Sequence, residues 1–377
     1  MARQRTMLPA VALYVGGFEA IGGIEACFED IAGALSGQAL DLSLFVWADD
    51  LPQLRTIARS GVRVHRSSLR RGSRFGWPDR ALFSRHGAKL KDVDTIVLGK
   101  FPPPAVLRRM LAIGGRSRGR PAEVQYITAY RPSEMWPSGM PAFIAESIDT
   151  MIVQSPDFAA DLRAMGFSGR IVEVPYLPPL APVTPAFDPP ADRICRLGFL
   201  GRFVSQKNLF YLLDIIAALA GEPVELHMFG EGEHDARLRA DVAEHGLPVI
   251  FHGAVPRADV PAAIDSCDIF LNPSISEGQC LVALEVLSRG RPFLASAVGA
   301  IPQILARGQF GAILPLDNAP VAAAIVQRTI AEWRDGRWTP EAVADDYRRA
   351  HRAHEILQTY LDLFSGTGRG DGAAVAS

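Results

Sequence analysis

The chain has 377 residues, a length typical of two or three domains, and 48% of its residues are hydrophobic, which is enough for large cores. Its formal net charge is only −2, and no apolar run reaches the roughly 18 residues that a membrane-spanning helix needs. The four cysteines form no closely spaced pair, which argues against a zinc cluster or a disulfide framework and suits a reducing cytosol.

The first half alternates β-like runs with helical stretches. It opens with "MARQRTMLPAVALYVGG", in which basic residues precede a short apolar run. A signal peptide is one interpretation, but no small-residue cleavage site follows, and we favour a first buried strand, Val11 to Val15, that enters a glycine turn. Apolar residues at helical spacing follow in "IEACFEDIAGALS". Further strands are predicted at 41–47, 94–99, 124–128 and 149–155.

A basic segment lies between Arg63 and Arg120. It holds 15 Lys and Arg but three Asp and Glu, so its net charge is +12 while the rest of the chain carries −14. Aromatic and basic residues interleave within it, a composition that suits an interface with an anionic membrane. The alternative is a solvated arginine face. The interleaved residues are Phe75, Trp77, Leu82 and Phe83 with Arg70, Arg71, Arg74, Arg80 and Arg85.

A proline-rich stretch, Pro178 to Arg193, separates this half from a second series of strands and helices. Strands are predicted there at 195–201, 224–230, 249–253, 268–274 and 292–296. Continuous apolar strands separated by helices predict parallel sheets covered on both faces. We therefore predict an α/β protein with two doubly wound Rossmann-like domains facing a cleft, and ligands beyond the carboxyl ends of the strands. The predicted boundaries are 1–184, 185–345, a closing helix at 346–365 that packs back towards the first domain, and a disordered tail at 366–377.

One motif, "NPSISEGQCLVALEVLSRG", places two acids on a turn and on the helix that follows it. Backbone N–H groups at such a helix start form an anion site suited to phosphate. Glu277 lies at the mouth of this site, and Glu285 can accept two hydroxyl hydrogen bonds, as a ribose diol would supply. The alternative is an acid at a helix start and a solvated helix residue. The amides concerned are those of Gln279, Cys280, Leu281 and Val282.

Cations and glycines follow three other strands. Arg202 and Lys207 come after the strand at 195–201 and can neutralise a diphosphate. Glycine pairs permit close backbone approach to a ligand, although each pair can equally well serve a turn. No dinucleotide fingerprint follows the first strand, which weakens a dehydrogenase interpretation. The glycine pairs are Gly22 with Gly23 and Gly230 with Gly232.

Together these motifs resemble the retaining glycosyltransferases of the GT-B fold, family 4 (glycosyl transferases group 1). That family typically shows "GGxE" after its first strand, a "GR…K" element, a "G.G" turn and "PS..EG…L..LE", and this chain carries "GGIE", Arg202 with Lys207, Gly230 with Gly232, and "PSISEGQCLVALE". It departs where the usual Phe-Gly after "EG" is Gln279-Cys280, and where the first domain often supplies a His. "YITAYRPSEMW" has no His, so that role is empty or falls to Tyr130 or Arg131.

The resemblance implies sugar transfer from a UDP or GDP sugar with retention at the anomeric carbon and no metal. Arg202 and Lys207 would hold the diphosphate with the amides from Gly278 to Val282, Glu285 would bind the ribose, and Glu277 would position the sugar. Residues 251–256 would lie beside the base.

The expected acceptor is a lipid-linked or growing bacterial saccharide, and nucleic acid is not an expected partner. We expect a cytoplasmic enzyme that is peripheral at the inner membrane face. The alternatives are a sugar-nucleotide epimerase of the same fold and a non-catalytic scaffold.

Overall fold

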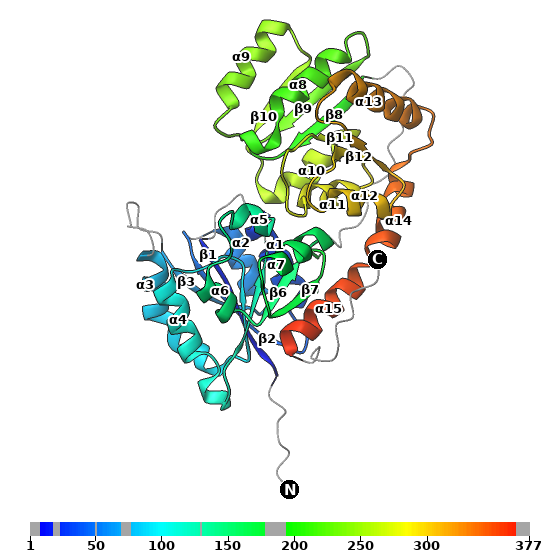
Figure 1. Ribbon diagram of the computed structural model, residues 1–377. Coiled ribbons are helices and arrows are strands. Elements are labelled where there is room, and N and C mark those ends of the chain that lie inside the picture. The colour runs from blue at the N-terminus through cyan, green and yellow to red at the C-terminus, as the bar shows by residue number, and fades with distance from the viewer. Residues whose placement is uncertain are drawn as a thin grey trace. The chain divides into compact units, whose positions relative to one another are not determined.

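The computed structural model describes residues 8–17, 23–49, 51–68, 77–128, 130–177 and 194–366 (Figure 1). The chain forms two compact units: unit 1 comprises Met1–Leu177 and His354–Ser377, and unit 2 comprises Pro178–Ala353. Several residues singled out in the sequence lie outside the described part of the chain. They are Gly22, Arg70, Arg71, Arg74, Phe75, the side chain of Trp77, the proline-rich stretch 178–193 and the tail from 367.

Unit 1 is built on a seven-stranded sheet in the order β3-β2-β1-β4-β5-β6-β7, with all neighbouring strands parallel. β1 is buried along its whole length, as expected for an apolar strand covered on both faces. The strands are β1 (Ala10–Gly17), β2 (Asp41–Trp47), β3 (Arg63–Ser67), β4 (Thr95–Leu98), β5 (Glu123–Ile127), β6 (Thr150–Val153) and β7 (Arg170–Glu173).

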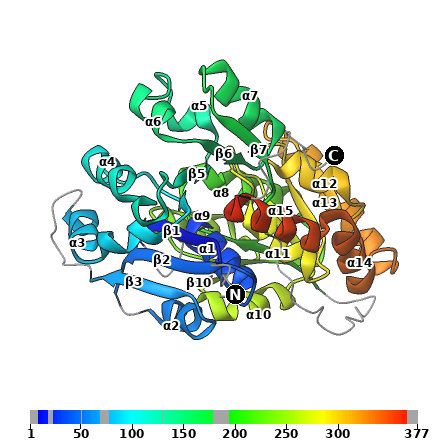
Figure 2. The same ribbon diagram turned by 90° about the horizontal axis from the view of Figure 1, so that it is seen from below.

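Helices cover both faces of this sheet. Figure 2 shows α3, α4, α6 and α7 on one side and α1, α2 and α15 on the other. The helices are α1 (Gly23–Leu35), α2 (Pro52–Arg59), α3 (Trp77–His86), η1 (Gly87–Asp92), α4 (Pro104–Ile113), η2 (Arg116–Arg118), α5 (Pro132–Met135), α6 (Ala142–Ser147), α7 (Pro156–Ala164) and α15 (Ala353–Ser365).

Unit 2 repeats the plan with six parallel strands in the order β10-β9-β8-β11-β12-β13. Its strands are β8 (Cys195–Leu200), β9 (Val224–Phe229), β10 (Val249–Gly253), β11 (Ile269–Asn272), β12 (Phe293–Ser296) and β13 (Gly311–Leu314). Its helices are η3 (Ser205–Lys207), α8 (Leu209–Ala218), α9 (Asp235–His245), η4 (Arg257–Asp259), α10 (Val260–Asp265), α11 (Leu281–Ser288), α12 (Ile301–Arg307), α13 (Ala319–Arg334) and α14 (Pro340–His351). Both units are doubly wound, which confirms the predicted fold class.

The helical end of the chain is divided between the units. α14 packs against α11 of unit 2, and Arg352, with a left-handed φ of 34°, separates it from α15. α15 is bound to unit 1 by hydrogen bonds from Thr95 Oγ1 to the Phe364 carbonyl (2.9 Å) and from Gln125 Nε2 to the Leu363 carbonyl (2.8 Å). The segment 346–365 is therefore the end of one helix and the whole of another.

Burial corrects the expectation for the basic segment. Leu82 and Phe83 lie on α3 with exposed fractions of 0% and 3%, inside the core between this helix and the sheet. Leu82 and Phe83 lie on the buried face of this helix, and Arg80 and Arg85 lie on its exposed face, so the two kinds of residue interleave in the sequence. The prediction that these two side chains meet a membrane is wrong.

Candidate functional site

Lys207 and Glu277 meet at the carboxyl edge of the sheet in unit 2. β8 and β11 are neighbours in the sheet but not in the chain, so the strand order reverses between them. The loops that leave these two strands carry Lys207 and Glu277, and Lys207 Nζ lies 2.5 Å from Glu277 Oε1. Ligands of doubly wound folds bind at such a switch point. Two residues predicted separately from the sequence thus form one ion pair at that point.

Glu277 is 8% exposed and accepts further hydrogen bonds from its own loop. Asn272 Nδ2, at the end of β11, lies 3.1 Å from Oε1, and Ser274 Oγ lies 2.7 Å from the same oxygen. A buried carboxylate is stable when it is paired and hydrogen-bonded in this way. Glu277 is therefore held in one orientation, and it is not a freely solvated acid at a helix start.

The two loops are also joined through their backbones. The Ile275 N–H donates to the Gln206 carbonyl (2.9 Å), and Gln206 Nε2 donates to the Ser276 carbonyl (2.6 Å). Because Gln206 precedes Lys207, this double contact fixes the cation relative to the loop that carries Glu277.

Cys280 ends this loop and begins α11 with a left-handed φ of 62°, a conformation that suits Gly. Its thiol is buried and accepts from Asn272 Nδ2 at 3.1 Å. Burial, with a smaller contribution from the Glu277 charge, raises the pKa of this thiol to about 12. The thiol therefore stays protonated at neutral pH and is no nucleophile, because only the thiolate is reactive. All four cysteines are buried and free.

Glu285 lies in α11, is 8% exposed, and forms an ion pair with Arg257 of η4. The alternative interpretation of Glu285 as a solvated helix residue is therefore wrong. Arg257 neutralises the carboxylate and can hold it towards a ligand, but it occupies part of the hydrogen-bonding capacity that a diol would use. Whether Glu285 binds ribose stays a prediction.

Gly230 and Gly232 are required by the packing of one loop against another. A Cβ on Gly230 would collide with the Gly201 carbonyl, and one on Gly232 would lie 2.5 Å from the Phe203 carbonyl. The space beside these glycines is therefore filled by the loop after β8, and their contact with a ligand stays a prediction. Arg202, on that same loop, is exposed.

The switch point of the other sheet, between β1 and β4, also carries an ion pair. Lys100, after β4, lies 2.7 Å from Glu25 Oε1 and 3.2 Å from the Gly17 carbonyl. Glu25 belongs to the "GGIE" motif, is 7% exposed, and lies in the first turn of α1, which begins at Gly23. Lys100 thus contacts both β1 and α1.

Tyr130 and Arg131 follow β5 and differ in their surroundings. Tyr130 is 48% exposed. Arg131 Nε contacts Asp161 Oδ2 at 2.9 Å, and this hydrogen bond is the main reason that the pKa of Asp161 is lowered. Arg131 is thus engaged by α7, which leaves Tyr130 as the more accessible of the two candidates for the role of the missing His.

Known protein families match both halves of the chain. Residues 195–331 match the family model of glycosyl transferases group 1, and residues 22–176 match that of the glycosyl transferase 4-like domain. The chain belongs to the GT-B glycosyltransferases.

Curated relatives match this glycosyltransferase over part of its length. A 2-deoxystreptamine glucosyltransferase of Streptomyces kanamyceticus is 31% identical over 180 residues, covering 44% of each chain. A putative teichuronic acid biosynthesis glycosyltransferase, TuaC, of Bacillus subtilis (strain 168) is 29% identical over 164 residues, covering 44% of this chain and 38% of TuaC. The match therefore spans less than half the length of these relatives.

Solved structures match the glycosyltransferase over nearly its whole length. Sucrose-phosphate synthase from Thermosynechococcus elongatus has a TM-score of 0.72 at 18% identity, covering 95% of this chain and 100% of that one. Anabaena Alr3699/HepE in complex with UDP and glucose has a TM-score of 0.70 at 16% identity, covering 94% and 99%. At these identities the likeness establishes the fold alone.

Sequence reasoning missed four polar residues that contact the predicted ones: Lys100, Asn272, Ser274 and Arg257. Asn272 and Ser274 lie inside the quoted motif. A polar residue that ends a buried strand, as Asn272 does, could have indicated a contact with the site. The sequence offers no comparable signal for Arg257, because its pairing with Glu285 depends on how η4 packs.

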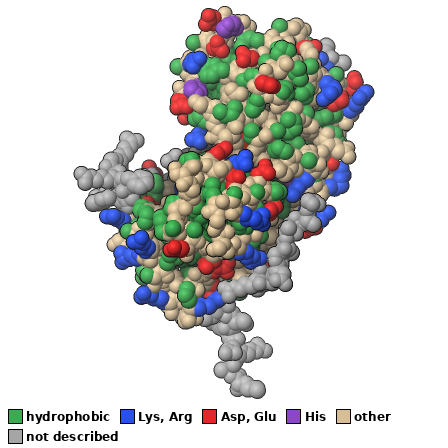
Figure 3. Space-filling view, in the orientation of Figure 1, with side chains coloured by type: hydrophobic (Ala, Val, Ile, Leu, Met, Phe, Trp, Pro, Cys, Tyr) green, Lys and Arg blue, Asp and Glu red, His purple; other side chains and the backbone are tan. Residues whose placement is uncertain are grey.

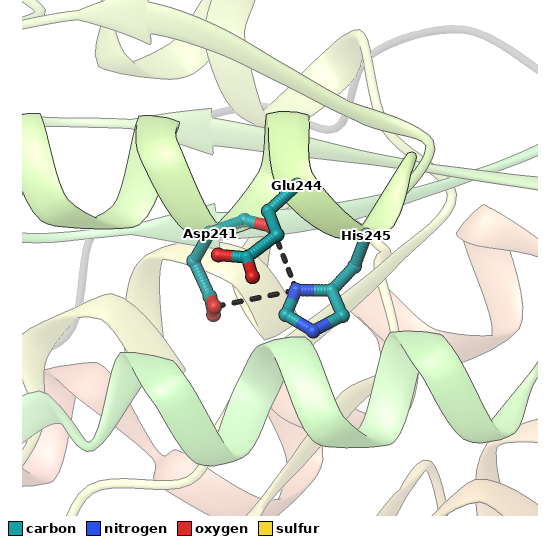
Figure 4. Close-up of side chains that lie close together, drawn as sticks. All are labelled: Asp241, Glu244 and His245. Carbon is teal, nitrogen blue, oxygen red and sulfur yellow. Dashed lines mark hydrogen bonds and ion pairs between the residues drawn. The ribbon is translucent and has the colours of Figure 1, made fainter.

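A group of possible metal ligands lies on α9 of the glycosyltransferase (Figure 4). Ligand atoms of Asp241, Glu244 and His245 lie within 4.8 Å of one another, and His245 Nδ1 is 3.0 Å from the Asp241 carbonyl. His245 and Glu244 are exposed, and the trio follows from their spacing on one helical turn. We assign no metal site to it.

None of the helices described is long and apolar enough to cross a membrane.

Proposed function

We propose that the chain is a retaining glycosyltransferase of family 4 that transfers a sugar from a nucleotide-diphosphate donor to a saccharide acceptor. The observation that carries this proposal is the Lys207–Glu277 pair at the switch point of unit 2. A cation and a fixed carboxylate at this place suit a ligand that has both a diphosphate and a hydroxyl-rich sugar. Relatives that include a glucosyltransferase support the same reaction class.

In this mechanism, catalysis rests on stabilising the departing diphosphate. Arg202 and Lys207 supply positive charge, and the backbone amides from Gly278 to Val282, at the start of α11, supply donors. Glu277 binds the transferred sugar, and Glu285 binds the ribose. The acceptor attacks from the face that the diphosphate leaves, and a leaving phosphate oxygen takes the acceptor proton, which gives retention.

The donor is a UDP or GDP sugar, and the reaction needs no metal because Arg202 and Lys207 neutralise the diphosphate. Anabaena Alr3699/HepE is solved with UDP and with UDP-glucose, which supports UDP as the first nucleotide to test. The epimerase alternative is not favoured, since both family models describe glycosyl transferases.

A calorimetric binding panel of UDP, GDP, ADP and their sugars tests this proposal, followed by donor hydrolysis and acceptor screening with the best donor in EDTA. We expect micromolar binding of one nucleoside diphosphate and slow hydrolysis of its sugar without acceptor. Nucleotide binding with no turnover of any donor, with or without acceptors, would support the non-catalytic scaffold. Strict dependence on a divalent cation would contradict the metal-free mechanism.

We also propose that unit 1 attaches to an anionic membrane surface, with a lipid-linked saccharide as acceptor. Figure 3 shows basic side chains gathered over α3 and α4. Two of the three acids near them are occupied, because Asp79 accepts from Trp47 Nε1 (3.0 Å) and Asp94 pairs with Arg118 and Arg120, while Asp92 on η1 is exposed. The exposed cations on α3, η1, α4 and η2 are Arg80, Arg85, Lys89, Lys91, Arg108, Arg109 and Arg116.

Because Leu82 and Phe83 are buried, this attachment is electrostatic. Each cation near an anionic surface contributes about 1 kcal/mol, and the attraction falls with salt. Co-sedimentation with vesicles is expected for anionic but not neutral lipid and should be lost in high salt. Replacing Arg108 and Arg109 by Glu should abolish it, whereas the same change at Arg328, exposed on α13 of unit 2, should not. Equal binding to both lipids, or to neither, contradicts the proposal.

A further inference from the structure

The carboxylate of Glu277 is held through one of its two oxygens. Lys207 Nζ, Asn272 Nδ2 and Ser274 Oγ all contact Oε1, at 2.5, 3.1 and 2.7 Å. No donor from the described residues contacts Oε2. One oxygen is therefore saturated by the protein while the other is open to a ligand.

The two neutral donors are themselves fixed. Asn272 is 3% exposed and Ser274 is 0% exposed. Asn272 Nδ2 also donates to the Cys280 sulfur at 3.1 Å, and Ser296 Oγ, on β12, donates to the Ser274 carbonyl. Supports of this kind lock a side chain within the narrow range of positions that a reaction tolerates.

Lys207 alone cannot supply this orientation. Its ammonium is a point charge on a flexible stem, and it has three N–H donors, of which Glu277 engages at least one. A diphosphate that binds the remaining donors draws the cation towards itself and weakens its attraction for Glu277. The carboxylate then depends on the neutral donors to stay in place.

We propose that Asn272 and Ser274 are positioning residues of the transfer reaction, which fix Glu277 through Oε1 so that Oε2 accepts a hydroxyl of the transferred sugar. This inference rests on the proposed function and deepens it. Both residues contact Glu277, whose proposed ligand is the sugar, so their effect should fall on turnover and not on nucleotide affinity. Lys207, by contrast, serves both the diphosphate and Glu277.

The test compares Ser274→Ala and Asn272→Ala with a control, Thr329→Val. Each of the first two variants removes one neutral donor to Glu277 and adds no charge. The control removes another buried hydroxyl of unit 2, on α13, which donates to the Ile325 carbonyl. For each protein, donor turnover is measured as kcat and KM, UDP binding by calorimetry, and folding by thermal melting.

We expect kcat to fall about 10–100-fold in both site variants, as small misplacements of a reacting group do. The UDP dissociation constant should change less than about threefold, since neutral donors to a carboxylate carry no phosphate contact. Thr329→Val should keep its turnover. A kcat equal to that of the parent in both site variants overturns the inference. An equal loss of kcat in the control, or a loss of UDP affinity as large as the loss of kcat, also overturns it. Turnover by the parent chain is the separate readout of the proposed function itself.

Discussion

Lys207 and Arg202 lie on the same loop, but Lys207 is paired with Glu277 whereas Arg202 is exposed. Lys207→Ala and Arg202→Ala should each weaken nucleoside diphosphate binding by about 1.5–3 kcal/mol, the range for a charged hydrogen bond. Lys207→Ala should also lower kcat further, since it leaves Glu277 without its cation. Calorimetry and steady-state kinetics measure both effects. Parental values for both variants would mean that these cations are ordinary surface residues.

Glu285 and Glu277 should respond differently to loss of charge. Glu285→Gln should raise the donor KM with a smaller effect on kcat, since it weakens a proposed nucleotide contact and its pairing with Arg257. Glu277→Gln should mainly lower kcat. Both are measured with the best donor of the binding panel, and equal, small effects at the two positions contradict the assigned roles.

His351 makes the stability of unit 2 depend on pH. It is 3% exposed at the end of α14, and burial, with a smaller contribution from Arg307, lowers its pKa to about 4, against the opposing charge of Asp346. Between pH 6.5 and 4 the unfolded chain therefore binds a proton that the folded chain does not. The free energy of unfolding should fall as pH drops through this window, by at most about 3 kcal/mol.

Urea unfolding at pH 7.5 and pH 5 measures this effect. His351→Gln should reduce the difference between the two pH values, whereas the same change at His354, an exposed histidine on α15, should not. An unaltered difference in His351→Gln assigns the acid sensitivity to other groups.

At the scale of elements, the strands that the sequence analysis missed share one property. β3, β7 and β13 each lie at the edge of a sheet, and their residues are mostly half-exposed. An edge strand buries less of its surface, so it lacks the continuous apolar run by which the central strands were predicted. Burial of Leu82 and Phe83 was misjudged for a related reason, because the side of a helix that faces the core is set by packing.

α15 contributes to the stability of unit 1 although it lies at the far end of the sequence. Phe364 is fully buried, and Tyr360 donates to the Pro175 carbonyl at 3.1 Å. Phe364→Ala should lower the stability of unit 1 by about 3–5 kcal/mol, the usual effect of emptying such a site. Hydrogen exchange should then quicken in β4 and β5 but not in β8 and β11. Gln358→Ala, on the exposed side of α15, is the control. Equal acceleration in both units would contradict the separate dependence.

For the whole molecule, the repeated alternation of apolar strands and helices was enough to predict two doubly wound units. The order of motifs was enough to locate Lys207 and Glu277 on loops at the carboxyl ends of strands. What the sequence could not supply was the contacts between loops that lie far apart in the chain. Lys207 meets Glu277, and Arg257 meets Glu285, only when the strands and helices that carry them are in place.

The attachment of α15 to unit 1 has a consequence for the order in which the protein can be made. During translation, β1 to β7 leave the ribosome first. The carbonyl groups that accept hydrogen bonds from Thr95 and Gln125 belong to Phe364 and Leu363, which emerge after all of unit 2. Until then the surface that Phe364 covers stays open to water, and a growing chain with exposed apolar surface is prone to aggregate. The part of the protein that is translated first is therefore the part that is completed last, and chaperones that guard nascent chains should be needed longest by unit 1.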